Sequence, residues 1–298
     1  MQDGQFFDMI FLSQVLKKKI VEAEQDQLRE LFSGETYDYT GEYRIVRFFN
    51  SNGFDANWDW NDVTLVTHAS LDKLYLLRNL VKHWQGSISI AIFVPDLDAS
   101  YANSALKRLK ACDPLVQKYV SFHLVYPADI PADVSMGDVL DDLTCEEFKE
   151  ELIDIPSYDK DEIVYPHNLL RNVARSGVYS EFFFLIDIDL MPTSGLRKEF
   201  LDFVNRKELW DNHDDADIYI VPAFELEEHQ DLPQNKAELV DLVTAGTVRP
   251  FHTDTCENCH KAEKYNEWEK LQSKDKLEIG FEANWSEQWE PFYFARRK

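Results

Sequence analysis

The chain has 298 residues, of which 44% are hydrophobic and 13% aromatic, so it is long enough to bury the core of one large α/β domain or two smaller ones. It has 31 Lys and Arg residues against 55 Asp and Glu residues, and the net charge of −24 argues against DNA, RNA or an anionic membrane as partner, because each requires a phosphate-neutralising surface. The sequence has no signal peptide and no run of about 18 apolar residues. The protein is therefore either cytosolic or a piece of a longer chain.

The first 61 residues have a mixed pattern that predicts a packing extension, with a helix over 14–32 and a short strand over 43–49. From residue 62 to 298 apolar runs alternate with amphipathic stretches, which predicts a single nucleotide-binding domain of α/β class. Its first half is expected to contain strands at 63–67, 88–94 and 120–125, with a helix capped by Ser70 and ended by Gly86 and another over 101–109.

The second half begins after an acidic stretch, 129–162, in which thirteen acidic residues predict a solvated insertion. A helix from Pro166, a strand over 182–186, a helix from Leu196 and a strand over 218–221 follow. This order is typical of a Rossmann-like, mostly parallel sheet with right-handed crossovers. It lacks the glycine-rich loop of dinucleotide enzymes and the P-loop.

The most informative motif is Asp187-Ile188-Asp189, which directly follows the apolar run Phe182-Phe183-Phe184-Leu185-Ile186. Side chains alternate along a strand, so Asp187 and Asp189 are expected to point the same way. Ligands of open α/β sheets collect at the carboxyl ends of the strands, and Mn²⁺ or Mg²⁺ prefers carboxylate oxygens. The pattern favours a metal-nucleotide site. A solvated turn is the alternative.

Other polar residues follow or precede the predicted strands at the same edge. His68 and Ser70 end the first strand as possible nucleotide contacts, and Asn168 and Arg171 share one face of the helix before the metal strand. Arg171 is suited to bind a phosphate or carboxylate, although it could equally pair with a surface acid. Glu225 and Glu290 are candidate general bases, and Glu225 could instead only cap the next segment.

The four cysteines include the pair Cys256 and Cys259, followed by His260. The spacing matches a haem-attachment motif, but nothing else in the chain suggests a haem protein, and no second cysteine pair completes a zinc site. A structural disulfide is the favoured interpretation, with Cys256 and Cys259 joined to each other or to Cys112 and Cys145. The single sequon Asn284-Trp285-Ser286 weakly supports the same secretory setting.

Taken together, several strings in order resemble glycosyltransferase family 49, and the resemblance runs from about Gly41 to the C-terminus. The Cys256/Cys259 pair favours the branch of the family that has a similar C-x-x-C. The strings are Val63-Thr64-Leu65-Val66-Thr67-His68-Ala69-Ser70, Tyr165-Pro166-His167-Asn168-Leu169-Leu170-Arg171-Asn172, Asp187-Ile188-Asp189-Leu190-Met191-Pro192, Val221-Pro222-Ala223-Phe224-Glu225, Asn235-Lys236-Ala237-Glu238-Leu239, Arg249-Pro250-Phe251 and Trp289-Glu290-Pro291-Phe292.

The resemblance implies a GT-A fold, UDP-glucuronate as donor, Mn²⁺ held by Asp187 and Asp189, and residence in the Golgi lumen as a type II membrane protein. The expected activity is inverting transfer of glucuronate to a xylose-terminated glycan on a glycoprotein. Thr67 and Asn172 lie in the matched strings and complete the expected donor contacts with His68, Ser70, Asn168 and Arg171.

Two departures from the family pattern bear on activity. The chain lacks the N-terminal anchor and stops at Lys298, whereas family members continue past the Trp289-Glu290-Pro291-Phe292 string. We expect a further metal-ligating histidine and part of the acceptor site to lie beyond Lys298. A transferase using another UDP-sugar, or a non-catalytic module of the same fold that binds or scaffolds glycan, remains the alternative.

Overall fold

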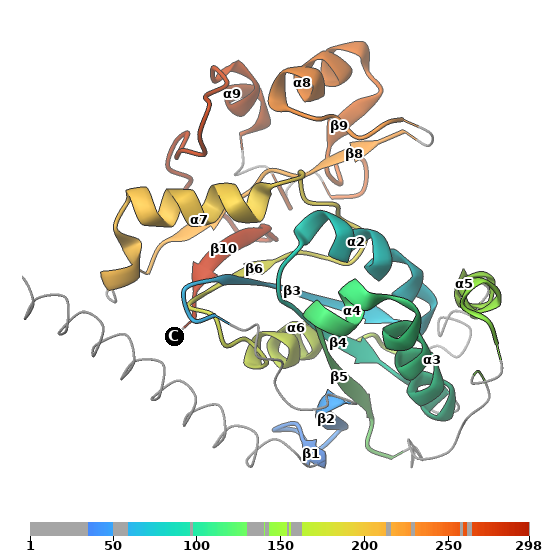
Figure 1. Cartoon of the computed structure of the whole chain (residues 1–298). Coiled ribbons are helices and arrows are strands. Elements are labelled where there is room, and N and C mark those ends of the chain that lie inside the picture. The colour runs from blue at the N-terminus through green and yellow to red at the C-terminus, as the bar shows by residue number, and fades with distance from the viewer. Residues whose placement is uncertain are drawn as a thin grey trace, which may run out of the picture.

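A computed structural model describes residues 35–49, 59–95, 98–129, 140, 143–153, 155, 163–212, 216–227, 230–256, 259–260 and 264–297. The main feature of these residues is an eight-stranded sheet with helices packed on both faces (Figure 1). Its strands are β1 (Glu35–Tyr37), β2 (Tyr43–Phe49), β3 (Val63–Ser70), β4 (Ile88–Phe93), β5 (Val120–Pro127), β6 (Phe182–Leu185), β7 (Ile218–Ile220) and β10 (Tyr293–Arg296).

The strands lie in the order β1-β2-β5-β4-β3-β6-β10-β7. The four central strands, β5, β4, β3 and β6, are parallel to one another, and β2 and β10 run antiparallel to their neighbours. Leu65 of β3 pairs with Ile88 of β4 on one side and with Phe184 of β6 on the other. The predicted α/β class with a mostly parallel centre is confirmed, and the arrangement is that of a GT-A-like fold.

Alternation along the central strands divides the core into two layers. On β3, Leu65 faces a layer that includes Leu77 and Trp84, whereas Val66 faces a layer that includes Val173. Both faces of the strand are buried, which explains why it is apolar without interruption. The first layer is formed with α2 (Leu77–Trp84), α3 (Asp98–Cys112), α4 (Pro114–Tyr119) and α7 (Leu196–Arg206), and the second with α6 (His167–Ser176) (Figure 1).

Several boundaries differ from the sequence prediction. β3 runs three residues further than expected, to Ser70, so His68 lies within the strand. Ser70 makes no side-chain cap, because its hydroxyl group donates to Asp72, and a 3-10 helix (Leu71–Leu76) precedes α2. Gln85 rather than Gly86 takes the left-handed conformation that ends α2. The prediction also missed α4 and β10, both of which are short.

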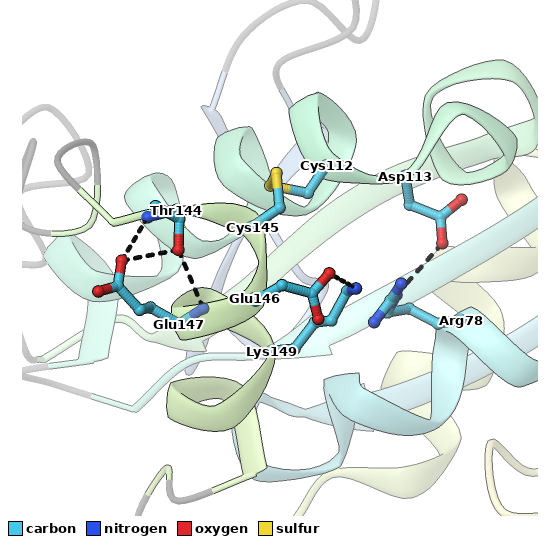
Figure 2. The surroundings of a disulfide bond; sticks show 8 residues. All are labelled: Arg78, Cys112, Asp113, Thr144, Cys145, Glu146, Glu147 and Lys149. Atoms are coloured by element: carbon cyan, nitrogen blue, oxygen red, sulfur yellow. Dashed lines mark hydrogen bonds and ion pairs between the residues drawn. A yellow bond between two sulfur atoms is a disulfide. The ribbon is translucent and has the colours of Figure 1, made fainter.

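The N-terminal part is described only from residue 35, and the helix predicted over 14–32 lies outside the described residues. Strands β1 and β2 extend the main sheet beyond β5, and Tyr43 to Phe49 form a strand as predicted. Most of the acidic stretch also lies outside the described residues. Its helix α5 (Cys145–Ile153) contacts α3, and Cys145 lies at disulfide distance from Cys112, with sulfur atoms 2.06 Å apart (Figure 2).

A smaller unit follows β7. It consists of the two-stranded sheet of β8 (Phe224–Leu226) and β9 (Val248–Pro250), together with α8 (Lys236–Ala245) and α9 (Tyr265–Lys270), which gather above the main sheet in Figure 1. Lys236 joins the two helices, because its ammonium group donates to the carbonyl oxygens of Trp268 and Leu271 and lies 4.1 Å from the Trp268 ring centre. Within the described residues, no helix combines the length and the hydropathy that a membrane span requires.

Candidate active site

The Asp187-Ile188-Asp189 motif lies in a turn at the carboxyl end of β6. Ile186 still donates a backbone hydrogen bond to Val66 of β3, and the amide of Leu190 donates to the carbonyl oxygen of Asp187, which closes the turn. Ile188 is 8% exposed and joins the core, so the aspartates on either side of it face away from the hydrophobic layer. The motif is therefore a tight turn anchored by one buried residue, which presents two carboxylates at the sheet edge.

Two basic side chains contact Asp187. Nη2 of Arg171 lies 3.1 Å from Oδ1 of Asp187, and Nε2 of His68 lies 3.2 Å from the same oxygen. Burial alone would raise the pKa of Asp187, but the contact with His68 and the charge of Arg171 outweigh it and lower the pKa to about 2. Asp187 is therefore a fixed negative charge at any physiological pH.

His68 belongs to a cluster of rings at the start of α6. Its Nδ1 lies 2.9 Å from the hydroxyl oxygen of Tyr165, and its ring centre lies 5.6 Å from that of His167. Tyr165 and His167 are themselves 4.6 Å apart, edge to face. Burial, followed by the nearby His68 and Arg171, lowers the pKa of His167. The cluster fixes the imidazole of His68 against Asp187.

Asp189 lies beside Asp187 and retains access to solvent. The protein packed around its carboxyl group and the negative charge of Asp187 raise its pKa, and the nearby His252 and His68 partly offset this rise. Two like charges held together in this way are stabilised by a cation between them. His252, which follows β9 in the smaller unit, thus acts electrostatically on Asp189.

The two candidate bases differ in their surroundings. Glu225 on β8 uses both carboxylate oxygens: Oε1 accepts from the backbone amide of His252 at 2.9 Å, and Oε2 accepts from Nε of Arg249 at 2.8 Å. Burial would raise the pKa of Glu225, but these two hydrogen bonds hold it below its usual value. The side chain of Glu290 is exposed. Its backbone amide donates a hydrogen bond to the carbonyl oxygen of Cys259 at 3.0 Å.

The remaining predicted donor contacts are only partly brought together. Thr67 is fully buried within β3, and its hydroxyl has no hydrogen-bond partner. Ser70 is also buried and bonds to Asp72, so neither presents a free surface at the edge. Asn168 and Asn172 are exposed on α6, near Arg171 in sequence. Their roles in donor binding stay predictions.

Sequence reasoning did not nominate Tyr165, His167 or His252. The first two lie in the same string as Arg171, and their position at the start of the helix that precedes the metal strand was the available signal. His252 comes from the loop after β9, and nothing in its local sequence indicates that it influences the pKa of Asp189. Among the described residues, no group of three or more His, Cys, Asp or Glu side chains is arranged to hold a metal ion.

Residues 62–298 match the model of a family described as "Glycosyl-transferase for dystroglycan". The chain is 31% identical to β-1,4-glucuronyltransferase 1 of Danio rerio, over 94% of this chain and 70% of that protein, and 32% identical to the Mus musculus protein of the same name, over 93% and 67%. It is 28% identical to the xylosyl- and glucuronyltransferase LARGE1 of Homo sapiens, over 96% of this chain and 32% of that protein. The chain therefore belongs to this glycosyltransferase family, as its motifs predict.

Proposed function

We propose that the chain transfers glucuronate from UDP-glucuronate to a xylose-terminated glycan, with inversion at the sugar carbon and with Mn²⁺ at Asp187 and Asp189. The observation that supports this most is the pair of carboxylates at the carboxyl end of β6, where ligands of such sheets bind. The names of the relatives supply the sugar, because both groups are called glucuronyltransferases.

The residues at this edge fit a divalent cation. Two carboxylates supply hard oxygen ligands. Burial, followed by the like charge of Asp187, raises the pKa of Asp189, and a cation would offset both effects. With only two protein ligands, most of the coordination shell is left for water and the diphosphate of the donor. When bound, the cation would supply positive charge to the diphosphate as it leaves the sugar.

The chain's own residues have separate roles in this proposal. Arg171 and His68 hold Asp187 in one position, so that it does not have to be ordered when the donor binds. Tyr165 in turn fixes the imidazole of His68. Arg171 is also within reach of any phosphate held at Asp187, where its guanidinium group would add a second positive charge.

Of the two candidate bases, we favour Glu290 for deprotonating the acceptor hydroxyl. Both oxygens of Glu225 already accept hydrogen bonds, and its lowered pKa makes it a weaker base. Glu290 is exposed to solvent. Its negative charge acts to raise the pKa of His167, which belongs to the ring cluster beside Asp187.

We also propose that the protein works in an oxidising compartment, the Golgi lumen. Cys112 with Cys145 and Cys256 with Cys259 lie at disulfide distance, with sulfur atoms 2.06 and 1.96 Å apart, and no described cysteine is left unpaired. Pairing of all four cysteines is unusual for a cytosolic protein.

Transfer assays with a panel of donors test the proposal. The 298-residue chain is incubated with UDP-glucuronate, UDP-xylose or UDP-N-acetylglucosamine, Mn²⁺ and a β-xyloside, and the product is identified by mass spectrometry. We expect glucuronate transfer that stops when EDTA removes the metal. Transfer from a different donor would favour the alternative transferase. Binding of glycan without turnover of any donor would favour a non-catalytic module.

A further inference from the structure

One long loop carries the chain's single N-glycosylation sequon, Asn284-Trp285-Ser286. The loop covers residues 271–292 and runs from the end of α9 in the smaller unit to the start of β10 in the main sheet (Figure 1). It contains no helix or strand. Connections longer than about 12–15 residues without secondary structure are uncommon in compact domains, and many of them carry a function. The mechanism proposed above uses only Glu290 of this loop.

The asparagine of the sequon is accessible in the folded protein. Asn284 is exposed, and the residues around it, 277–286, have no regular backbone structure. Asparagine glycosylation is found on surface loops, because the attached sugar chain is bulky and strongly hydrated. A sugar chain attached to Asn284 can therefore extend into solvent without displacing a packed helix or strand.

The serine of the sequon has no role that the fold explains. The hydroxyl oxygen of Ser286 is buried and makes no hydrogen bond to any described residue. A buried hydroxyl group without a partner destabilises a folded protein, and alanine would fill the same position without this penalty. N-glycosylation does require a hydroxyl group two positions after the asparagine. Modification of Asn284 thus explains a serine that packing does not.

The loop also exposes apolar side chains beside the sequon. Trp285 is 79% exposed and Ile279 is 57% exposed. Exposed apolar side chains that lie together favour association between molecules, and sugar rings can pack on the face of an indole ring. A glycan attached to the residue next to Trp285 would screen this ring from other protein molecules.

We infer that Asn284 carries an N-linked oligosaccharide that screens the exposed ring of Trp285. In this modification Nδ2 of Asn284 forms a bond to the anomeric carbon of an oligosaccharide linked to a lipid diphosphate. The bond between that carbon and the diphosphate oxygen breaks, the lipid diphosphate leaves with the bonding electrons, and one amide proton passes to a base. The inference depends on the proposed secretory location, where disulfides also form, and not on the transferase activity.

The site is tested by mass spectrometry. The 298-residue chain, fused to a cleavable secretory signal, is produced in mammalian cells and treated with peptide-N-glycosidase in heavy-oxygen water, which converts a glycosylated asparagine into labelled aspartate. We expect the label at position 284. Asn284→Gln and Ser286→Ala should each abolish the label and increase electrophoretic mobility, whereas Ser286→Thr should retain both label and mobility. Asn266→Gln, at an exposed asparagine outside any sequon, is the matched control and should migrate like the parent chain.

The screening role is tested on the folded protein by light scattering before and after enzymatic removal of the glycan. We expect self-association to increase on removal, and Trp285→Ser, which keeps the sequon, to lose this increase. Unchanged scattering of the parent chain overturns the screening role.

The outcomes separate this inference from the proposed function. If position 284 is unlabelled in a secreted chain whose four cysteines are in disulfides, the inference is overturned, and the proposed location and activity stand. Unchanged mobility of Asn284→Gln overturns it as well. A labelled position 284 in a chain that transfers no sugar has the opposite meaning: the modification is real, and the proposed transferase function fails.

Discussion

Arg171 on α6 extends its guanidinium group to Asp187 at the end of β6, with Nη2 3.1 Å from Oδ1 and 3.5 Å from Oδ2. Both side chains are about one-quarter exposed, so the pair is at the boundary between core and solvent. Such a pair orients the carboxylate and still leaves a cation access to it. In the proposed mechanism, Arg171 therefore acts first on Asp187, the proposed metal ligand, and only secondly on the donor.

The variant Arg171→Ala tests this role. We expect the affinity for UDP in the presence of Mn²⁺ to fall about tenfold, because Asp187 loses a charge-assisted partner worth roughly 1.5–3 kcal/mol, part of which solvent replaces. Isothermal titration calorimetry measures the affinity. Arg175→Ala on the same helix is the control, since Arg175 packs on Phe183 and not on Asp187. Equal affinities in the two variants would mean that the ion pair is only structural.

The double variant Asp187→Asn with Asp189→Asn removes both proposed metal ligands without changing their size. We expect Mn²⁺-dependent UDP binding to be lost while the thermal unfolding midpoint stays close to that of the parent chain, because both side chains lie outside the hydrophobic layers. Asp241→Asn, at an exposed position of α8, is the matched control. Unchanged UDP affinity in the double variant would sink the metal assignment.

The central strands could be predicted because they are buried on both faces and are therefore apolar throughout. Their neighbours in space could not. β10 is the last strand in sequence but lies between β6 and β7, and its four residues after Pro291 do not form a recognisable pattern. The ring centre of Phe294 on this strand lies 4.1 Å from that of Phe184. The two residues are more than a hundred positions apart in sequence, and only the strand order explains their contact.

The candidate active site could also be predicted only in part, because its long-range contacts depend on the strand order. The Asp187 motif is local and could be found, but its contact with His68 depends on β3 and β6 being adjacent. Their register pairs Val66 with Leu185, and extending it by two residues sets His68 opposite Asp187. A strand order with crossovers cannot be read from apolar periodicity. The electrostatic influence of His252 on Asp189 is still less local, since the two residues belong to different parts of the chain, the smaller unit and the end of β6.

The buried side chain of His123 should make the stability of the protein depend on pH. It is fully buried on β5, and burial, with a smaller effect of Arg47, lowers its pKa to about 3. Nδ1 accepts the amide of Phe48 at 3.2 Å, and Nε2 lies 3.0 Å from Oγ of Ser89, which itself donates to the carbonyl oxygen of Ala174. These bonds require the neutral ring with its proton on Nε2.

Because the pKa of His123 is lower in the folded than in the unfolded state, its contribution to stability is complete above about pH 6.5 and is lost as the pH falls toward 3. We expect the free energy of unfolding to fall by about 1.4 kcal/mol per pH unit below pH 6 through this group alone. Urea denaturation at pH 7, 6 and 5 measures the slope. His123→Gln should have a shallower slope, and His83→Gln, at the surface, should not; parallel slopes for all three chains would contradict the assignment.

The two cysteine pairs should differ in their effect on stability. The residues Cys112 and Cys145 are 33 apart in sequence, and Cys256 and Cys259 only three apart. Loop-closure entropy then predicts about 3–4 kcal/mol for the first bridge and about half of that or less for the second. Chemical denaturation of Cys112→Ser/Cys145→Ser and of Cys256→Ser/Cys259→Ser compares them. Alkylation of all four cysteines before reduction would instead show free thiols and a cytosolic setting.

The last prediction separates the two candidate bases. Glu290→Gln keeps the size of the side chain and removes its basicity, so kcat for glucuronate transfer should fall at least about a hundredfold while UDP affinity is unchanged. Glu225→Gln instead weakens the hydrogen bonds to His252 and Arg249, and we expect lower thermal stability with a smaller loss of kcat. Measurement of kcat, UDP affinity and the unfolding midpoint on both variants distinguishes the two roles. A hundredfold loss of kcat confined to Glu225→Gln would reverse the assignment, since hydrogen bonds that hold a carboxylate in the free enzyme can also aim it at an acceptor hydroxyl.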